Sequence, residues 1–141
     1  CVYPLQQGRK LRLKSPDRLI EEMLYFYNKL RVKNFIFRDP VFSIDRKHTV
    51  KICEKIINTN LKFNICIETH LKNVDNELAK ILKKAGIKLI YVGIESAIEE
   101  VRKDAKRTSD TNENQIEKVK YLEEKAKKRA RYIRPQTMIA A

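Results

Sequence analysis

Three short apolar segments, at residues 32–37, 61–67 and 88–94, constrain the fold of this chain more than any other feature. They begin 29 and 27 residues apart, and a stretch with helical periodicity follows each of the first two. Repeated strand–helix units of this length are typical of a parallel sheet whose strands are joined by right-handed crossovers. We therefore predict an α/β fold with a parallel sheet that is either open or rolled into part of a barrel.

The third segment is apolar from Leu89 to Ile94 except for Gly93. A strand that is apolar on both faces is typical of a parallel sheet that helices cover. Glu95 and Ser96 follow it directly. Because such sheets place functional side chains just beyond the carboxyl ends of their strands, we predict that this position belongs to a site.

Helix signals lie before and between the strands. Ser15 can cap a helix that the spacing of apolar residues extends to about residue 30. Asp45 and Asp75 are predicted to cap two more helices, and Gly86 is predicted to be the left-handed stop after the second. Further along, we predict a short helix over residues 98–106 and another that Thr111 caps.

Composition limits the class of protein. A chain of 141 residues with 43% hydrophobic and 35% charged residues fits one globular domain. Its longest apolar stretches are far short of the roughly 20 residues of a membrane span, and no signal peptide is visible, so we predict a cytoplasmic protein. The three cysteines are too few for a disulfide framework, and we predict that Cys53 and Cys66 are small core residues.

The chain is strongly basic, with 31 Lys and Arg against 18 Asp and Glu and a net charge of +13. Such an excess attracts phosphates, nucleic acid or an anionic membrane surface, although no recognisable nucleic-acid-binding module is present. Part of the excess can also be explained by solvated helix faces. Residues 125–134 hold six basic residues and no acidic one where the repeat would place an apolar strand. We predict no buried strand there, and Tyr132 and Ile133 are at best the remains of one.

Polar residues follow each of the three predicted strands: Arg38 and Asp39, then Glu68, Thr69 and His70, then Glu95 and Ser96. In a parallel sheet these ends lie side by side, so the groups are predicted to surround one crevice. Carboxylates accept hydrogen bonds from ammonium and ribose hydroxyl groups, and an arginine can hold a carboxylate. A polar ligand with an amine and sugar hydroxyls would suit this set.

Each of these residues also has a structural explanation. Asp39 precedes a proline and fits a turn, and Glu68 can form an ion pair with Arg38. His70 can be a solvated loop residue, and Ser96 can be the cap of the next helix. Their placement at three successive strand ends favours a site over these separate explanations, without identifying a reaction.

Four motifs resemble the radical S-adenosylmethionine (SAM) superfamily, and most closely the branch that often carries an N-terminal cobalamin-binding domain. Residues 1–17 resemble the stretch that begins at the last cysteine of the CxxxCxxC cluster loop. Phe-Ile-Phe-Arg-Asp-Pro-Val-Phe at residues 35–42 resembles the second strand of that branch. Ile-Cys-Ile-Glu-Thr at residues 65–69 resembles the third, and Gly-Ile-Glu-Ser at residues 93–96 the fourth.

The resemblance implies a partial (β/α)6 TIM-like barrel that binds a [4Fe-4S] cluster through three thiolates, the usual ligands of such clusters. It implies cleavage of SAM to methionine and a 5′-deoxyadenosyl radical, with an electron from a reductant protein such as ferredoxin or flavodoxin. Cobalamin would bind in the full-length protein. Cys1 would be the third cluster ligand, and residues 1–124 would be a partial core domain followed by a basic tail at residues 125–141.

The resemblance also implies which residues meet SAM. Asp39 falls near the place where the family meets the SAM amino group, and Glu68, Glu95 and Ser96 would face the SAM amino acid or ribose. With Arg38, these residues form the predicted SAM-binding set.

Two departures from the family pattern matter. The chain begins at the third cluster cysteine, so we expect this chain alone to be inactive, and the tail resembles a truncated or non-native end. We therefore predict a fragment of a radical SAM enzyme whose substrate is unknown. The alternatives are an RNA-modifying radical SAM enzyme, suggested by the charge of +13, and a non-catalytic relic or basic binding module.

Overall fold

The computed structural model describes residues 8, 10–93, 116–117, 119–120 and 133–136. In chain order the elements are α2 (Pro16–Leu30), β1 (Asn34–Ile36), α3 (Arg46–Asn58), β2 (Asn64–Thr69), the 3-10 helix η1 (Leu71–Asn73), α4 (Asn76–Lys84), β3 (Ile87–Gly93) and β4 (Ile133–Gln136). The helix predicted at residues 98–106 lies outside the described residues. Of the helix predicted after Thr111, only residues 116–117 and 119–120 are described, and they are helical.

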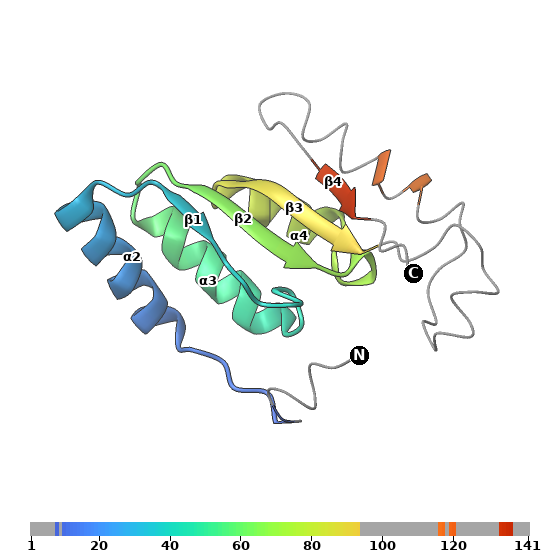
Figure 1. The fold of residues 1–141 in the computed structure, drawn as a ribbon, viewed down its shortest axis with the longest axis horizontal. Helices are drawn as coiled ribbons and strands as arrows, with labels where there is room; N and C mark the ends of the chain where they lie inside the picture. Colours follow the sequence, from blue (N-terminus) through green and yellow to red (C-terminus); the bar gives the residue numbers. More distant parts are fainter. Residues whose placement is uncertain (1–7, 9, 94–115, 118, 121–132, 137–141) are drawn as a thin grey trace.

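The four strands form one sheet in the order β1-β2-β3-β4, and each neighbouring pair is parallel. Helices α3 and α4 lie on the same side of this sheet (Figure 1). A doubly wound sheet reverses its strand order at a switch point and carries helices on both faces. The described strands show neither feature, so this part of the sheet is wound in one direction.

Most of the hydrophobic core lies between α3, α4 and the sheet face that these helices cover, and Met23 of α2 also belongs to it. Burial alternates along β2, where Ile65, Ile67 and Thr69 are buried. Their neighbours on the strand point to the other face, which we call the uncovered face because no described helix packs on it. A sheet that is open and a sheet rolled into part of a barrel were both predicted, and the described strands form an open parallel sheet.

The predicted caps are confirmed. The Ser15 hydroxyl accepts a hydrogen bond from the Arg18 amide at 3.3 Å. The Asp45 carboxylate accepts one from the His48 amide at 3.0 Å, so α3 begins where its sequence predicts. Gly86 has a φ of 91°, which L-residues rarely adopt, and it ends the turn after α4.

Two features of the sheet differ from the prediction. Strand β2 covers residues 64–69 rather than 61–67, because its pairing with β1 begins at Asn64 opposite Asn34. Strand β4 begins at Ile133, where at best the remains of a strand were predicted, and it pairs with β3 from Ile90 to Gly93. Backbone hydrogen bonds to a neighbouring strand do not require apolar side chains, and the edge of a sheet tolerates a proline such as Pro135.

Candidate functional site

The uncovered face carries a defined set of side chains, because residues paired in a parallel register point to the same side of a sheet. Ile36 pairs with Cys66, and Cys66 pairs with Leu89. One step nearer the carboxyl ends, Glu68 pairs with Tyr91. The uncovered face is therefore apolar at Ile36, Cys66 and Leu89 and becomes polar at Glu68 and Tyr91. The polar residues lie toward the carboxyl ends of the strands, where parallel sheets bind ligands.

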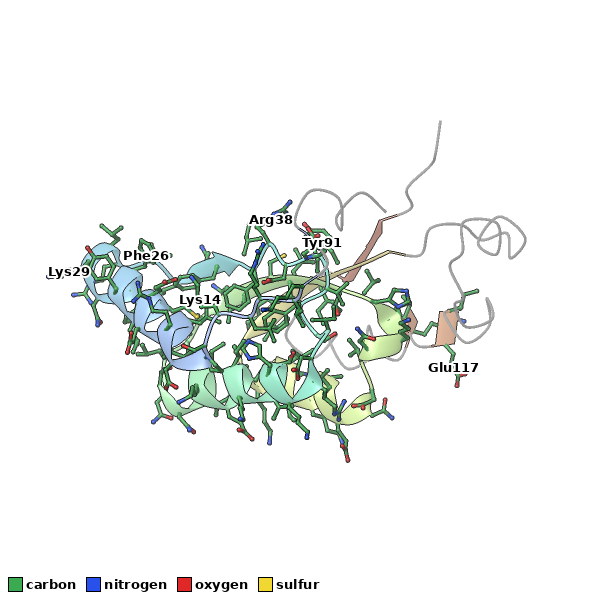
Figure 2. The ribbon with its side chains drawn as sticks, turned by 90° about the horizontal axis from the view of Figure 1, so that it is seen from below. Lys14, Phe26, Lys29, Arg38, Tyr91 and Glu117 are labelled. Carbon is green, nitrogen blue, oxygen red and sulfur yellow. The ribbon has the colours of Figure 1, made fainter. Side chains whose placement is uncertain are left out.

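Arg38 and Glu68 meet at this end. Nη1 of Arg38 donates a hydrogen bond to Oε1 of Glu68 at 3.1 Å, and the two side chains form an ion pair. The amide of Phe37 donates to the Cys66 carbonyl at 2.9 Å, which continues the β1–β2 pairing beyond β1 and fixes the start of the loop. Figure 2 shows Arg38 and Tyr91 on the side of the sheet away from α3 and α4.

The exposure of this pair leaves both groups within reach of a ligand. The Arg38 side chain is 77% exposed and the Glu68 side chain 29% exposed. An ion pair so open to water contributes about 0–1 kcal/mol, so a ligand can replace either partner at little cost. The structural explanation of Glu68, that it pairs with Arg38, is therefore correct, and it is compatible with ligand binding.

The loop after β1 folds back over the end of the sheet. The amide of Phe42 donates to the Glu68 carbonyl at 2.8 Å, and the Phe42 ring stacks on Phe37 with centroids 5.3 Å apart. The buried hydroxyls of Ser43 and Thr69 hydrogen-bond to each other. Thr69 is thus removed from the polar set predicted at the strand ends, because its hydroxyl already has a buried partner.

Asp39 and His70 differ in how far their side chains are engaged within the described part of the chain. Asp39 is exposed and has no hydrogen bond or ion pair with the described residues. His70 is half-buried, and its Nδ1 accepts a hydrogen bond from the Lys72 amide at 3.3 Å, which caps the 3-10 helix. Asp39 is therefore available to a ligand beside Arg38, whereas one nitrogen of His70 has a structural role.

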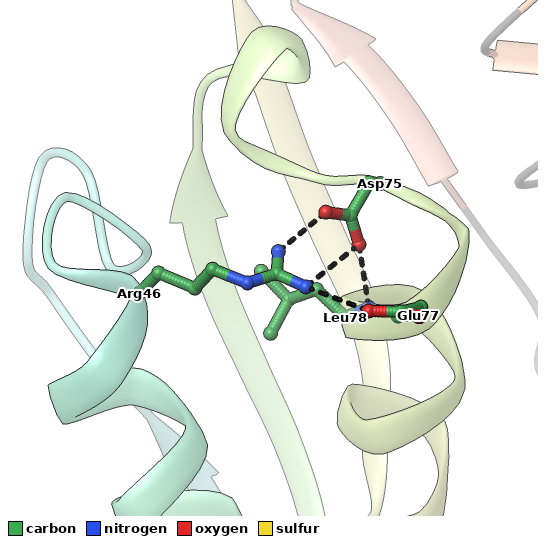
Figure 3. Close-up of polar contacts among 4 residues, drawn as sticks. All are labelled: Arg46, Asp75, Glu77 and Leu78. Carbon is green, nitrogen blue, oxygen red and sulfur yellow. Dashed lines mark hydrogen bonds and ion pairs between the residues drawn. The ribbon is translucent and has the colours of Figure 1, made fainter.

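A second polar cluster near the same end was not predicted. Arg46, the first residue of α3, contacts Asp75 through two nitrogen–oxygen pairs of 2.5 and 3.2 Å, and Glu77 at 3.4 Å (Figure 3). Asp75 also accepts from the Leu78 amide at 2.8 Å. This amide, together with Arg46, holds the pKa of Asp75 below its ordinary value. The cluster connects the first turns of α3 and α4. In the sequence, the only signal for it was the prediction that Asp75 caps a helix.

The described residues do not by themselves provide a site for an iron–sulfur cluster. Cys53 is completely buried in the core, and burial, with a smaller effect of Glu54, raises its pKa to about 12. Cys66 is half-buried on the uncovered face, so the prediction of a core residue holds for Cys53 only. Burial and Glu68 raise the pKa of Cys66, and Arg38 opposes them. No group of three metal-ligating side chains occurs among the described residues.

Three predicted site residues, Cys1, Glu95 and Ser96, lie outside the described part of the chain, so their roles remain predictions. No helix of the described residues is long and apolar enough to cross a membrane.

The fold and the site together define a class of protein. A parallel sheet wound in one direction, with helices on one face and a charged pair at its carboxyl end on the other, is typical of α/β domains that bind a polar ligand at the strand ends. The particular family follows from comparison with known proteins. The family model described as the Radical SAM superfamily matches residues 1–134, and the chain belongs to this superfamily.

Individual relatives are distant. An uncharacterized methyltransferase of Pyrococcus horikoshii is 29% identical over 97 residues, which are 69% of this chain and 21% of that protein. The anaerobic magnesium-protoporphyrin IX monomethyl ester cyclase of Cereibacter sphaeroides is 33% identical over 93 residues, or 63% of this chain and 15% of that protein. The enzyme of the same name from Rubrivivax gelatinosus is 28% identical over 91 residues. This chain therefore spans about a fifth or less of the length of these relatives.

Proposed function

We propose that this chain provides the SAM-binding wall of a partial (β/α)6 barrel in an enzyme that cleaves SAM reductively at a [4Fe-4S] cluster. The observation that carries the proposal is the family match over residues 1–134, combined with the Arg38–Glu68 pair at the carboxyl end of the uncovered face. The cluster would supply the electron for cleavage. From the resemblance of residues 1–17 to the cluster loop of the family, Cys1 would be one of its ligands.

The chemistry of the Arg38–Glu68 pair fits the amino-acid part of SAM. That part carries an ammonium and a carboxylate group, and the pair offers a cation and an anion at a separation of 3.1 Å. Arg38 would hold the carboxylate, and Glu68 would accept from the ammonium or from the ribose hydroxyls. Asp39, exposed and without a partner among the described residues, would supply a second carboxylate. Glu95 and Ser96 would meet SAM from the next strand end.

The similarity to a methyltransferase and to two cyclases supports the cobalamin-associated branch as the source of this chain. Cobalamin would then bind elsewhere in the full protein, and a protein such as ferredoxin or flavodoxin would supply the electron. The substrate would be set by regions outside this chain.

The test uses the full-length protein that contains this chain, after anaerobic iron–sulfur reconstitution. We expect a brown protein that forms 5′-deoxyadenosine from SAM when a reductant is added. Glu68→Gln is expected to weaken SAM binding about 10-fold to 100-fold, because a hydrogen bond to a charged group contributes about 1.5–3 kcal/mol.

The matched control is Glu77→Gln, which removes the same charge from an exposed glutamate on α4. It is expected to leave SAM binding unchanged within about twofold. A colourless protein that does not cleave SAM would refute the proposed activity. Equal effects of the two substitutions would refute the role of Glu68.

A further inference from the structure

A group of basic residues with no acidic residue among them lies at the end of the sheet opposite the candidate site. Residues 29–33, 59–63 and 83–88 lead into β1, β2 and β3, and Figure 1 shows the starts of these three strands side by side. We call these three segments the amino rim. They contain seven basic residues and no acidic residue: Lys29, Arg31, Lys33, Lys62, Lys83, Lys84 and Lys88.

The loops at the other end of the same strands have a different composition. Residues 37–45 and 70–75 contain two basic residues, Arg38 and Lys72, and three acidic residues, Asp39, Asp45 and Asp75. The two ends of the described strands therefore differ in charge.

The preference of helix ends for cations explains only some of the basic residues in the amino rim. Lys29 lies in the last turn of α2, and Lys83 and Lys84 lie in the last turn of α4, where a cation interacts favourably with the helix dipole. Lys33 and Lys62 lie in loops, so the helix dipole does not explain them.

Lys88 is placed by an irregularity in β3. Ile65 pairs with Ile87, and the next residue of β2, Cys66, pairs with Leu89, so Lys88 is an extra residue on β3. An irregularity of this kind changes the direction in which a side chain points. Lys33, Lys62 and Lys88 are all exposed, and none forms an ion pair with an acid in the described part of the chain.

We propose that the amino rim binds the phosphate backbone of a single-stranded RNA. Neighbouring strands lie about 4.8 Å apart, so lysines at the starts of three adjacent strands form a row of positive charge across the sheet end. A row of this kind can follow a phosphodiester backbone, as the basic grooves of single-strand-binding proteins do. The clustered positive charges repel one another, and a polyanion would offset that repulsion.

An amide pair beside this row favours a nucleic acid over other polyanions. The Asn64 side-chain amide donates to the Asn34 side-chain oxygen at 2.8 Å, and both residues are exposed at the first positions of their strands. This bond leaves an Asn34 amide donor and an Asn64 carbonyl oxygen for further hydrogen bonds. Base edges offer complementary groups, and Asn34 directly follows Lys33.

A membrane surface fits the amino rim less well. Peripheral binding to a membrane combines basic residues with large apolar side chains on the same surface. Among the exposed large hydrophobic residues of the described chain, only Leu30 lies in the amino rim.

The RNA proposal does not rest on SAM cleavage, because the rim lies at the opposite end of the strands from Arg38 and Glu68. The test measures binding of the full protein to a fluorescently labelled single-stranded RNA of mixed sequence, by anisotropy, between about 50 and 200 mM salt. We expect the triple variant K33Q/K62Q/K88Q to bind about 10-fold to 100-fold more weakly at about 100 mM salt. The slope of log affinity against log salt is expected to fall by about 2, at about 0.7 for each phosphate contact.

The matched control is K47Q/K51Q/K80Q, which removes the same charge from exposed lysines within α3 and α4. It is expected to change affinity less than about threefold, and K33R/K62R/K88R is expected to bind as the unaltered protein does. Equal losses in the two glutamine variants would overturn the proposal, since binding would then depend on net charge alone. The absence of RNA binding, or binding to phosphatidylserine vesicles in its place, would overturn it as well.

Discussion

Gly86 lies so close to Phe63 that a Cβ atom on residue 86 would stand 2.6 Å from the Phe63 carbonyl oxygen. The atom in the way belongs to the backbone just before β2, and the Gly86 carbonyl itself accepts from the Ile65 amide at 3.0 Å. Residue 86 therefore packs the segment after α4 against the start of β2. A shift of either segment would disturb the sheet.

We expect Gly86→Ala to destabilise the fold by more than the roughly 1–3 kcal/mol of its positive φ alone, because the contact with Phe63 adds to that cost. Urea denaturation gives the difference in free energy of unfolding. Gly8→Ala is the matched control, since Gly8 has a φ of 80° with no atom within 4 Å of the added Cβ. Equal losses of stability for the two variants would show that the contact with Phe63 has no energetic role.

Because Ser43 and Thr69 form a buried hydrogen bond, we expect substitutions at these two residues to have strongly coupled effects on the free energy of unfolding. Thr69→Val is expected to cost about 1–3 kcal/mol, because it leaves the Ser43 hydroxyl buried without a partner. Ser43→Ala is expected to cost a similar amount, and the double variant less than the sum of the two. Thermal or urea unfolding of all four proteins completes the double-mutant cycle. Additive costs would contradict the coupling.

We expect the Asp75 carboxylate to make a pH-dependent contribution to the free energy of unfolding. Its pKa is held below the ordinary value of 3.8 by the Leu78 amide and by Arg46. The contribution is therefore complete above about pH 4 and is lost as the pH falls through the lower pKa of the folded state. Because the side chain is 57% exposed, we expect the pH-dependent part to be below about 1 kcal/mol.

The measurement is the free energy of unfolding between pH 2 and pH 6, with Asp75→Asn as the variant. Asparagine still caps a helix, so this substitution removes the charge and keeps the cap. We expect the difference between the two proteins to vanish at the acid end of the range. A difference that stays constant over the whole range would mean that the ionisation of Asp75 does not contribute.

The two described cysteines are expected to differ in reactivity. Cys53 has no exposed surface and a pKa of about 12, so alkylation at pH 8 should reach it only when the protein unfolds. Cys66 is half-buried on the uncovered face and should react in the folded protein, more slowly than a free thiol because its pKa is raised. Peptide mass spectrometry after timed alkylation distinguishes the two. Faster labelling of Cys53 than of Cys66 would contradict the assignment of the faces.

Several elements of the fold could be predicted because their signals are local. A cap residue bonds to an amide three positions away, as Ser15 and Asp45 do, and the stop at Gly86 depends on one backbone angle. These interactions need no partner from elsewhere in the chain. The apolar segments likewise indicated a parallel sheet, since strands and helices alternate at a regular spacing.

The details of the sheet depended on partners distant in sequence. The limits of β2 follow from its register with β1 and β3, and β4 forms because the edge of β3 offers backbone hydrogen bonds. Whether a face is covered also depends on where the connecting helices pack. For this reason Cys66, on an apolar strand, was predicted to be in the core and lies on the uncovered face.

The sequence by itself determined that this chain forms βα units with polar residues at the strand ends, because caps, periodicity and spacing act over a few residues. Only the tertiary structure decided which of those polar residues meet. It joined Arg38 to Glu68 across two strands, removed Thr69 by pairing it with Ser43, and brought Arg46 to Asp75. The physical reason is that such contacts arise from the register of strands and the packing of helices, which depend on residues about 30 positions apart.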